Sequence, residues 1–138
     1  MRCIKITDRV GVSDLIFVLG KRALVSEWLA HDVWTVQEGD DGYFEDLCNS
    51  GRRMPGSVFI PALTKVIQVI DGRFEGIEAG GDKPWVIVES IDSSFHLLHA
   101  AEDVLSNARS RFPAASDYDA PIVPWRRSRA PNADSRNA

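Results

Sequence analysis

The spacing of apolar and polar residues predicts a mixture of strands and helices in the first third of the chain. Alternation with period two over 2–7 predicts a short strand, and apolar positions at helical spacing predict a helix over 13–24, with Gly20 as its weakest point. Residues 26–37 hold no breaker and predict one strand, or two strands separated by an irregularity near His31.

Two helices are predicted in the next stretch. Residues 43–48 have the composition of a short helix that ends near Gly51. The pattern over 57–66 is also helical, but Pro61 suits only the first turn of a helix. We therefore expect this second helix to begin nearer Ile60.

An Asp71-Gly72 pair is the most specific local signal in the chain. It separates two apolar-rich segments, 67–70 and 73–77. A two-residue Asp-Gly connection is typical of a tight hairpin turn, because glycine accepts the positive φ that such a turn requires. The pattern therefore predicts two short strands joined at this pair.

A second hairpin is predicted from the strand patterns of 85–91 and 95–99, with 92–94 as its turn. Both faces of the first half of 85–91 are apolar, which is typical of a central strand. Residues 101–112 then show helical spacing, and Pro113 ends that helix.

The predicted order of elements is β-α-β-α-α-β-β-β-β-α. Consecutive hairpins favour an antiparallel sheet, and helices near both ends of the chain can cover one of its faces. We predict a single α+β domain over 1–112, with a mainly antiparallel sheet of about five to six strands and three to four helices. Residues 113–138 contain four prolines and few large apolar groups. They predict a mostly disordered C-terminal tail, because such a segment buries too little surface to offset its ordering entropy.

Charge divides unevenly between these two parts. The chain has a net charge of −4, and its 44% hydrophobic and 26% charged residues exclude a fully disordered chain or a collagen-like repeat. Residues 121–138 hold four arginines and one aspartate, a balance of +3, so residues 1–120, with 12 basic and 19 acidic groups, balance at −7. An acidic body repels nucleic-acid phosphates, and only the basic tail has the charge to contact them.

Five carboxylates gather in nine residues that contain no basic side chain. One interpretation is that an aspartate of this run caps the helix over 43–48 and the others are solvated. The other is a docking surface for a basic protein, which the acidic body favours. The predicted function is a non-catalytic protein-interaction module, such as an inhibitor or neutralising partner of a basic protein. Its predicted contact residues are Glu38, Asp40, Asp41, Glu45 and Asp46.

Two tryptophans offer an alternative contact surface. Trp28 and Trp34 are six residues apart, so a regular strand would place both on one face. If that face is open, it can bind a small molecule or a partner. Small-ligand binding is thus the alternative function. A further alternative is an enzyme in which Glu75 and Glu89 share one sheet face over a cavity. We assign no catalytic residue, because no convergent set of reactive groups is evident.

Metal and cofactor binding are not expected. His96 and His99 fall on opposite faces of the predicted strand, and the chain has neither a C-x-x-C nor an H-E-x-x-H motif. Cys3 and Cys48 are interpreted as reduced thiols, and the longest strictly apolar run is five residues. With no signal-peptide pattern at the start, the sequence predicts a cytoplasmic location and no membrane partner.

Overall fold

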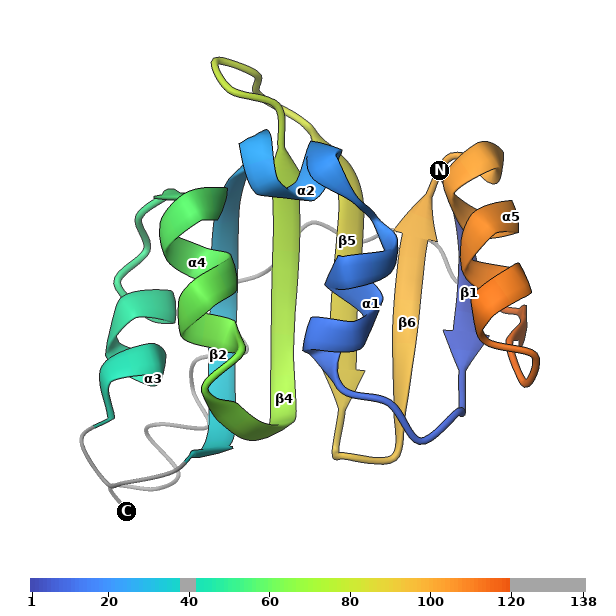
Figure 1. The fold of residues 1–138 in the computed structure, drawn as a ribbon, viewed down its shortest axis with the longest axis horizontal. Coiled ribbons are helices and arrows are strands. Elements are labelled where there is room, and N and C mark those ends of the chain that lie inside the picture. The colour runs from blue at the N-terminus through green and yellow to red at the C-terminus, as the bar shows by residue number, and fades with distance from the viewer. Residues whose placement is uncertain (38–41, 120–138) are drawn as a thin grey trace.

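The central feature of the fold is an antiparallel sheet, seen face-on in Figure 1. The computed structural model describes residues 1–37 and 42–119. Its strands are β1 (Arg2–Ile6), β2 (Glu27–Gln37), β3 (Met54–Pro55), β4 (Val66–Ile77), β5 (Pro84–Ile91), β6 (Phe95–Ala100) and β7 (Ser116–Asp117). Its helices are α1 (Val12–Val18), α2 (Lys21–Val25), α3 (Tyr43–Cys48), α4 (Gly56–Leu63) and α5 (Glu102–Arg111). The strand order is β3-β2-β4-β5-β6-β1-β7, and every pairing is antiparallel.

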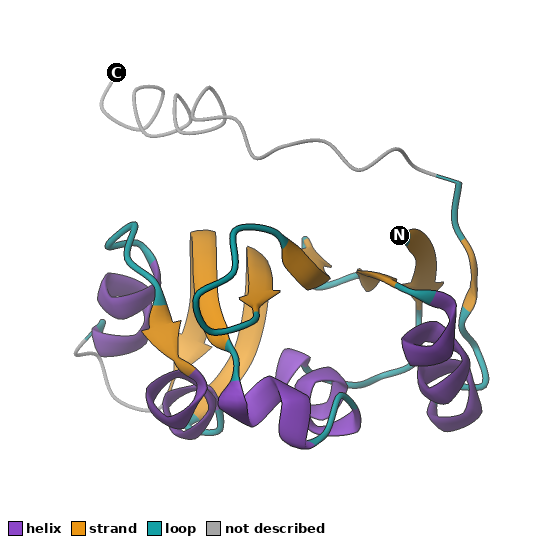
Figure 2. Ribbon diagram, turned by 90° about the horizontal axis from the view of Figure 1, so that it is seen from above, coloured by secondary structure: helices purple, strands orange, loops and turns teal. Residues whose placement is uncertain are grey.

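This architecture confirms the predicted α+β class, the single domain and the antiparallel sheet. The described residues hold seven strands and five helices, more than predicted, because short elements were not anticipated. Helices α1, α2, α4 and α5 lie on one face of the sheet (Figure 2). Among the described residues no helix covers the opposite face, which we call the helix-free face.

The core lies between the sheet and these helices. Strand register brings one buried apolar residue from each of five neighbouring strands into a single row across the sheet. From β1 to β2 these residues are Ile4, Leu98, Val88, Phe74 and Ala30. Side chains two residues apart on a strand share a face. The strand predicted from the alternation over 2–7 is confirmed, and Ile4 and Ile6 are its fully buried residues on the core side.

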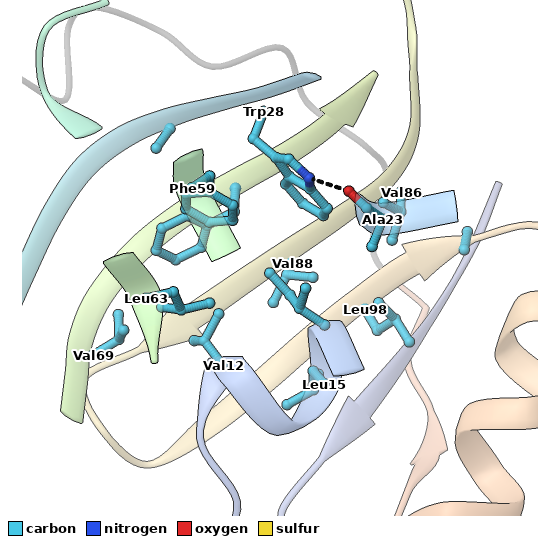
Figure 3. Close-up of a cluster of buried hydrophobic side chains, with 14 of the residues drawn as sticks. Val12, Leu15, Ala23, Trp28, Phe59, Leu63, Val69, Val86, Val88 and Leu98 are labelled. Carbon is cyan, nitrogen blue, oxygen red and sulfur yellow. Dashed lines mark hydrogen bonds between the residues drawn. The ribbon is translucent and has the colours of Figure 1, made fainter. Parts of the chain in front are cut away.

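Aromatic packing joins α4 to the sheet. The rings of Trp28 and Phe59 stack with centroids 5.1 Å apart, and Phe59 also contacts Phe44 and Phe74. The indole N–H of Trp28 donates to the carbonyl of Ala23 at 2.9 Å (Figure 3). The only polar atom of the Trp28 side chain is thereby satisfied inside the core.

The hairpin predicted at Asp71-Gly72 is wrong. Residues 66–77 form one continuous strand that pairs with β2 on one side and β5 on the other. Gly72 lacks a positive φ, and a Cβ there would lie 3.2 Å from the rings and methyls of Phe74 and Val33. A side chain at position 72 would thus be in tight contact with Phe74 and Val33 inside a strand. The Asp71 carboxylate accepts the Asp92 N–H at 2.8 Å, so this residue holds the adjoining turn.

The second predicted hairpin, formed by β5 and β6, is confirmed. Asp92 and Ser93 both adopt positive φ in its turn, and the Ser94 N–H donates to the Ile91 carbonyl at 2.8 Å. The turn is also tied to β4, because the Ser93 N–H donates to the Ile70 carbonyl at 2.9 Å.

Two predicted helix boundaries are corrected. The helix predicted over 13–24 is divided into α1 and α2 by Gly20, whose φ is +73°. Helix α4 begins at Gly56, well before Ile60, and contains Pro61. The early start follows from a close approach: the Gly56 N–H donates to the Ser26 carbonyl, and a Cβ at Gly56 would lie 2.3 Å from the Leu24 carbonyl oxygen.

The described chain continues past the boundary predicted at residue 112. Ser116 and Asp117 form β7 on the outer edge of β1, and the Tyr118 N–H donates to the Cys3 carbonyl at 3.0 Å. The Arg109 guanidinium reaches the Asp117 carboxylate at 2.9 Å and joins α5 to β7. The predicted disordered tail covers 113–138, but 113–119 are described and include β7. Residues 120–138 lie outside the described residues, so the disorder predicted for them stays a prediction.

Candidate functional site

The predicted acidic contact surface is only partly described. Glu38, Asp40 and Asp41, including the expected cap of α3, lie outside the described residues. Glu45 and Asp46 lie in the first turns of α3. Glu45 is half-buried and accepts the Thr35 N–H of β2 at 3.3 Å, whereas Asp46 is exposed. Glu45 therefore combines a structural contact with a charge near the surface.

Helix α3 is fixed to the outer edge of β2 by side chains. Asn49, which follows α3, accepts the Val33 N–H through Oδ1 at 2.9 Å and donates through Nδ2 to the Val33 carbonyl at 3.1 Å. With Glu45, it occupies backbone groups that a further strand would otherwise use. This arrangement closes the strand edge to pairing and holds α3 beside the end of β2.

The prediction that Trp28 and Trp34 lie on one face, as in a regular strand, is wrong. The register of β2 shifts between His31 and Trp34, and Asp32 between them has a φ of +48°. This irregularity, predicted near His31, changes which residues face the core. Trp28 is completely buried against Phe59, whereas the exposed fraction of Trp34 is 59%. Trp28 is thus a core residue, and Trp34 alone is available for contact.

Trp34 is one of three exposed apolar residues on β2 and α3, two elements joined by the Glu45–Thr35 hydrogen bond. The exposed fraction of Val36, two residues further along β2, is 43%, and that of Tyr43 at the start of α3 is 57%. The link from Glu45 to Thr35 places these segments side by side. We name this group the aromatic–acidic surface: Trp34, Val36, Tyr43, Glu45 and Asp46.

A second concentration of polar groups crosses the helix-free face. Strand alternation places one or two such residues of β2, β4, β5, β6 and β1 on this face, in neighbouring positions. They are called the polar belt: His31, Arg73, Glu75, Glu89, His99 and Cys3. Charged and imidazole side chains are seldom so well buried unless they are paired. The side chains of Arg73 and His99 are only 7% and 3% exposed.

One half of the polar belt is an ion-pair group centred on Glu75. Its Oε1 lies 3.2 Å from His31 Nε2, and its Oε2 accepts from Arg73 Nε at 3.2 Å and Nη2 at 3.0 Å. Burial works to raise the pKa of Glu75, but the His31 hydrogen bond and the Arg73 charge outweigh it and lower that pKa. Glu75 is therefore a firmly ionised carboxylate at neutral pH, which does not suit a general acid.

The other half joins Glu89, His99 and Cys3. His99 Nε2 lies 3.0 Å from Glu89 Oε1 and 3.8 Å from Cys3 Sγ. A relay of the Cys-His-Glu type needs the acid and the thiol on different ring nitrogens, and here both approach Nε2. Burial, followed by the Glu89 charge, raises the pKa of the Cys3 thiol to about 11. The thiol stays protonated at neutral pH, so this arrangement does not provide an activated nucleophile.

The enzyme alternative requires Glu75 and Glu89 to share one sheet face over a cavity, and the structure meets the first part of this condition. Glu75 and Glu89 do share one sheet face. Each is paired with a histidine, and Glu75 also with Arg73. His31, Arg73 and Cys3 were missed by the sequence reasoning. The sequence pattern places Arg73 after a hairpin turn, and only the register across five strands brings these residues together.

The remaining histidine and cysteine predictions can be placed directly. His96 donates from Nε2 to the Val10 carbonyl at 2.8 Å on the helix-covered side, whereas His99 lies on the helix-free face. Within the described ranges, no group of three or more histidine, cysteine or acidic side chains is arranged to hold a metal ion. Cys3 and Cys48 are free and buried, and burial followed by the Glu45 charge raises the pKa of Cys48 to about 12.

Comparisons of the chain with protein-family models, with curated proteins and with solved structures found no match. None of the helices in 1–37 and 42–119 is long and apolar enough to cross a membrane. Any functional proposal therefore rests on the chemistry of the described side chains.

Proposed function

We propose that this protein is a protein-interaction module that binds a basic partner protein through the aromatic–acidic surface. The observation that carries the proposal is the exposure of Trp34 on a sheet strand beside the carboxylate-bearing helix α3. Tryptophan and tyrosine are the side chains most enriched at the energetic centres of protein interfaces. Trp34 and Val36 on β2 and Tyr43 on α3 are exposed apolar side chains of the kind that such a contact uses.

Charge determines which partner this surface suits. Glu45 and Asp46 stand beside the apolar group, and the body of the protein carries a balance of −7. Complementary charge mainly increases association rate and selectivity, so a positively charged protein is the favoured partner. The same charge disfavours nucleic acid, whose phosphates it repels. We propose the cytoplasm as the location, where buried thiols such as Cys3 and Cys48 stay reduced.

The experiment is a comparative capture with the full chain. Wild-type protein and the Trp34→Ala variant are immobilised, and retained proteins from a native lysate of the source cells are identified. Phe17→Ala serves as the matched control, because Phe17 is 80% exposed on α1 and lies outside the aromatic–acidic surface. Thermal unfolding of all three proteins controls for folding.

The expected result is a basic protein retained by wild type and Phe17→Ala and lost with Trp34→Ala. Its purified form should then bind wild type with at least about tenfold higher affinity than the Trp34→Ala variant. The proposal is overturned if no protein is retained selectively, if the retained protein is acidic, or if Trp34→Ala retains it as well as wild type does.

A further inference from the structure

A polar cavity lies at the end of the sheet where β4 begins, and its lining residue Gln68 pairs with Val36 of the aromatic–acidic surface. Three segments distant in sequence meet there: the loop between β1 and α1, the start of β4, and the turn between β5 and β6 (Figure 1). The cavity has a volume of about 360 Å³. This size falls within the range typical of small-molecule sites, roughly 300–1,000 Å³.

Two polar atoms of its lining residues are buried without a hydrogen-bond partner. They are His96 Nδ1 and Asp8 Oδ1. The residue exposure of His96 is only 8%. Because the Val10 carbonyl can only accept, His96 Nε2 carries the proton and Nδ1 is left as a bare acceptor. A buried acceptor without a donor is energetically unfavourable, and a bound donor removes that cost.

The remaining lining residues indicate which chemical group the other end of a ligand carries. Arg9 lines the cavity and is exposed, and within the described part of the chain it forms no ion pair. Its neighbour Asp8 supplies the only other charge of the lining. Val10 and Val69 add apolar wall, and the hydroxyl of Ser93 adds a hydrogen-bonding group.

We propose that this cavity binds a small zwitterion, of the chemical class of a free α-amino acid. Its ammonium group donates towards Asp8 and His96, directly or through a bound water, and its carboxylate pairs with Arg9. The apolar wall accepts the side chain. This inference is separate from the partner-binding proposal, because Asp8, Arg9 and His96 do not belong to the aromatic–acidic surface.

The test is an NMR titration of the full chain, labelled with ¹⁵N at histidine and at the backbone. The probes are L-leucine, L-glutamine and L-arginine. N-acetyl-L-leucine amide, which has neither charge, and methylammonium or acetate, which each have one, are the comparison ligands. The Nδ1 resonance of His96 is the specific readout, because it moves when a bare imidazole nitrogen accepts a hydrogen bond.

The expected result is saturable binding of at least one amino acid, with a shift of the His96 Nδ1 resonance. Binding should weaken at least about tenfold in Arg9→Met and in Asp8→Asn. Arg52→Met is the control, because Arg52 lies outside the cavity lining. This variant should bind the amino acid as tightly as wild type does. The proposal is overturned if no amino acid binds, if the uncharged or singly charged probes bind as tightly, or if Arg9→Met leaves the affinity unchanged.

Discussion

At the scale of single residues, the same residue type serves opposite purposes according to its surroundings. Gly72 lies in an extended strand because its missing side chain makes room for Phe74 and Val33, whereas Gly20 adopts positive φ and separates α1 from α2. The Asp-Gly dipeptide carried a real turn signal, but pairing of β4 on both edges overrode it. Local turn propensity is a weaker constraint than two complete strand interfaces.

Substitutions at Gly72 distinguish a position inside a strand from a position in a tight turn. Gly72→Ala should lower the free energy of unfolding by about 1–3 kcal/mol, because the new Cβ crowds Phe74 and Val33. Gly72→Asn should lower it at least as much, since its amide is then buried. Urea denaturation measures both values. In a tight turn asparagine would be well tolerated, so an unchanged unfolding midpoint for Gly72→Asn would contradict the strand placement.

A buried histidine and a half-buried glutamate make the stability sensitive to acid. Burial lowers the pKa of His96 below its ordinary 6.5, against weaker opposing effects of the Val10 carbonyl and the Asp14 charge. The pKa of Glu75 is lowered below 4.5, since its His31 and Arg73 contacts outweigh burial. In both cases the unfolded chain binds protons more readily, so the stabilisation is complete above the ordinary pKa and is lost as pH falls below it.

Urea midpoints measured across pH should therefore be highest near neutral pH, begin to fall below about pH 6.5, and fall further below about pH 4.5. His96→Gln should remove most of the decrease in the urea midpoint that begins below about pH 6.5, and should leave the further decrease below about pH 4.5. A midpoint that stays constant or increases between neutral pH and pH 5 would refute a lowered pKa for His96.

At the scale of elements, long periodic segments could be predicted and contact-dependent segments could not. The positions of β1, β2, β5, β6, α3 and α5 follow from alternation, helical spacing and flanking breakers. The short strands β3 and β7 exist because β2 and β1 offer them an edge, and two-residue segments carry no periodicity. The start of α4 depends on the contact of Gly56 with the Leu24 backbone, which no local pattern contains.

The attachment of α3 to β2 gives a prediction at this scale. Asn49→Ala removes both side-chain hydrogen bonds to Val33 and should lower the free energy of unfolding by about 1–3 kcal/mol. Hydrogen exchange of the Val33 amide should become faster. Asn107→Ala, which removes one exposed bond to the Val18 carbonyl, is the control and should have a smaller effect. Equal effects of the two substitutions would show that Asn49 does not hold the edge.

At the scale of the whole molecule, the site depends on a detail of β2 that the sequence left open. The irregularity near His31 was expected, but its direction decides that Trp28 is core and Trp34 is surface. Likewise, alternation could suggest that Glu75 and Glu89 share a face. Only the order of the strands shows that His31, Arg73 and His99 lie beside them. Non-local pairing therefore carries the information that the chain pattern lacks.

The molecule divides its polar chemistry between two places. The members of the polar belt are buried or half-buried and both of its carboxylates are paired, whereas Trp34 is exposed on β2, the strand to which Glu45 attaches α3. Side chains that already hydrogen-bond one another gain less from a partner than exposed side chains do. Exposed apolar area with nearby charge retains that capacity, which places the proposed partner contact at α3 and the end of β2.

The most direct measurement of this account is the association and dissociation kinetics of the captured basic partner with wild type, with Trp34→Ala, and with Glu45→Gln/Asp46→Asn. Glutamine at position 45 keeps an acceptor for the Thr35 N–H while removing the charge. Raising salt to physiological strength should slow association with wild type several-fold, and the charge-neutral variant should associate more slowly and respond less to salt. Trp34→Ala should instead dissociate at least about tenfold faster. Rates that are indifferent to salt, to the neutralised carboxylates and to the loss of Trp34 would contradict the central claim.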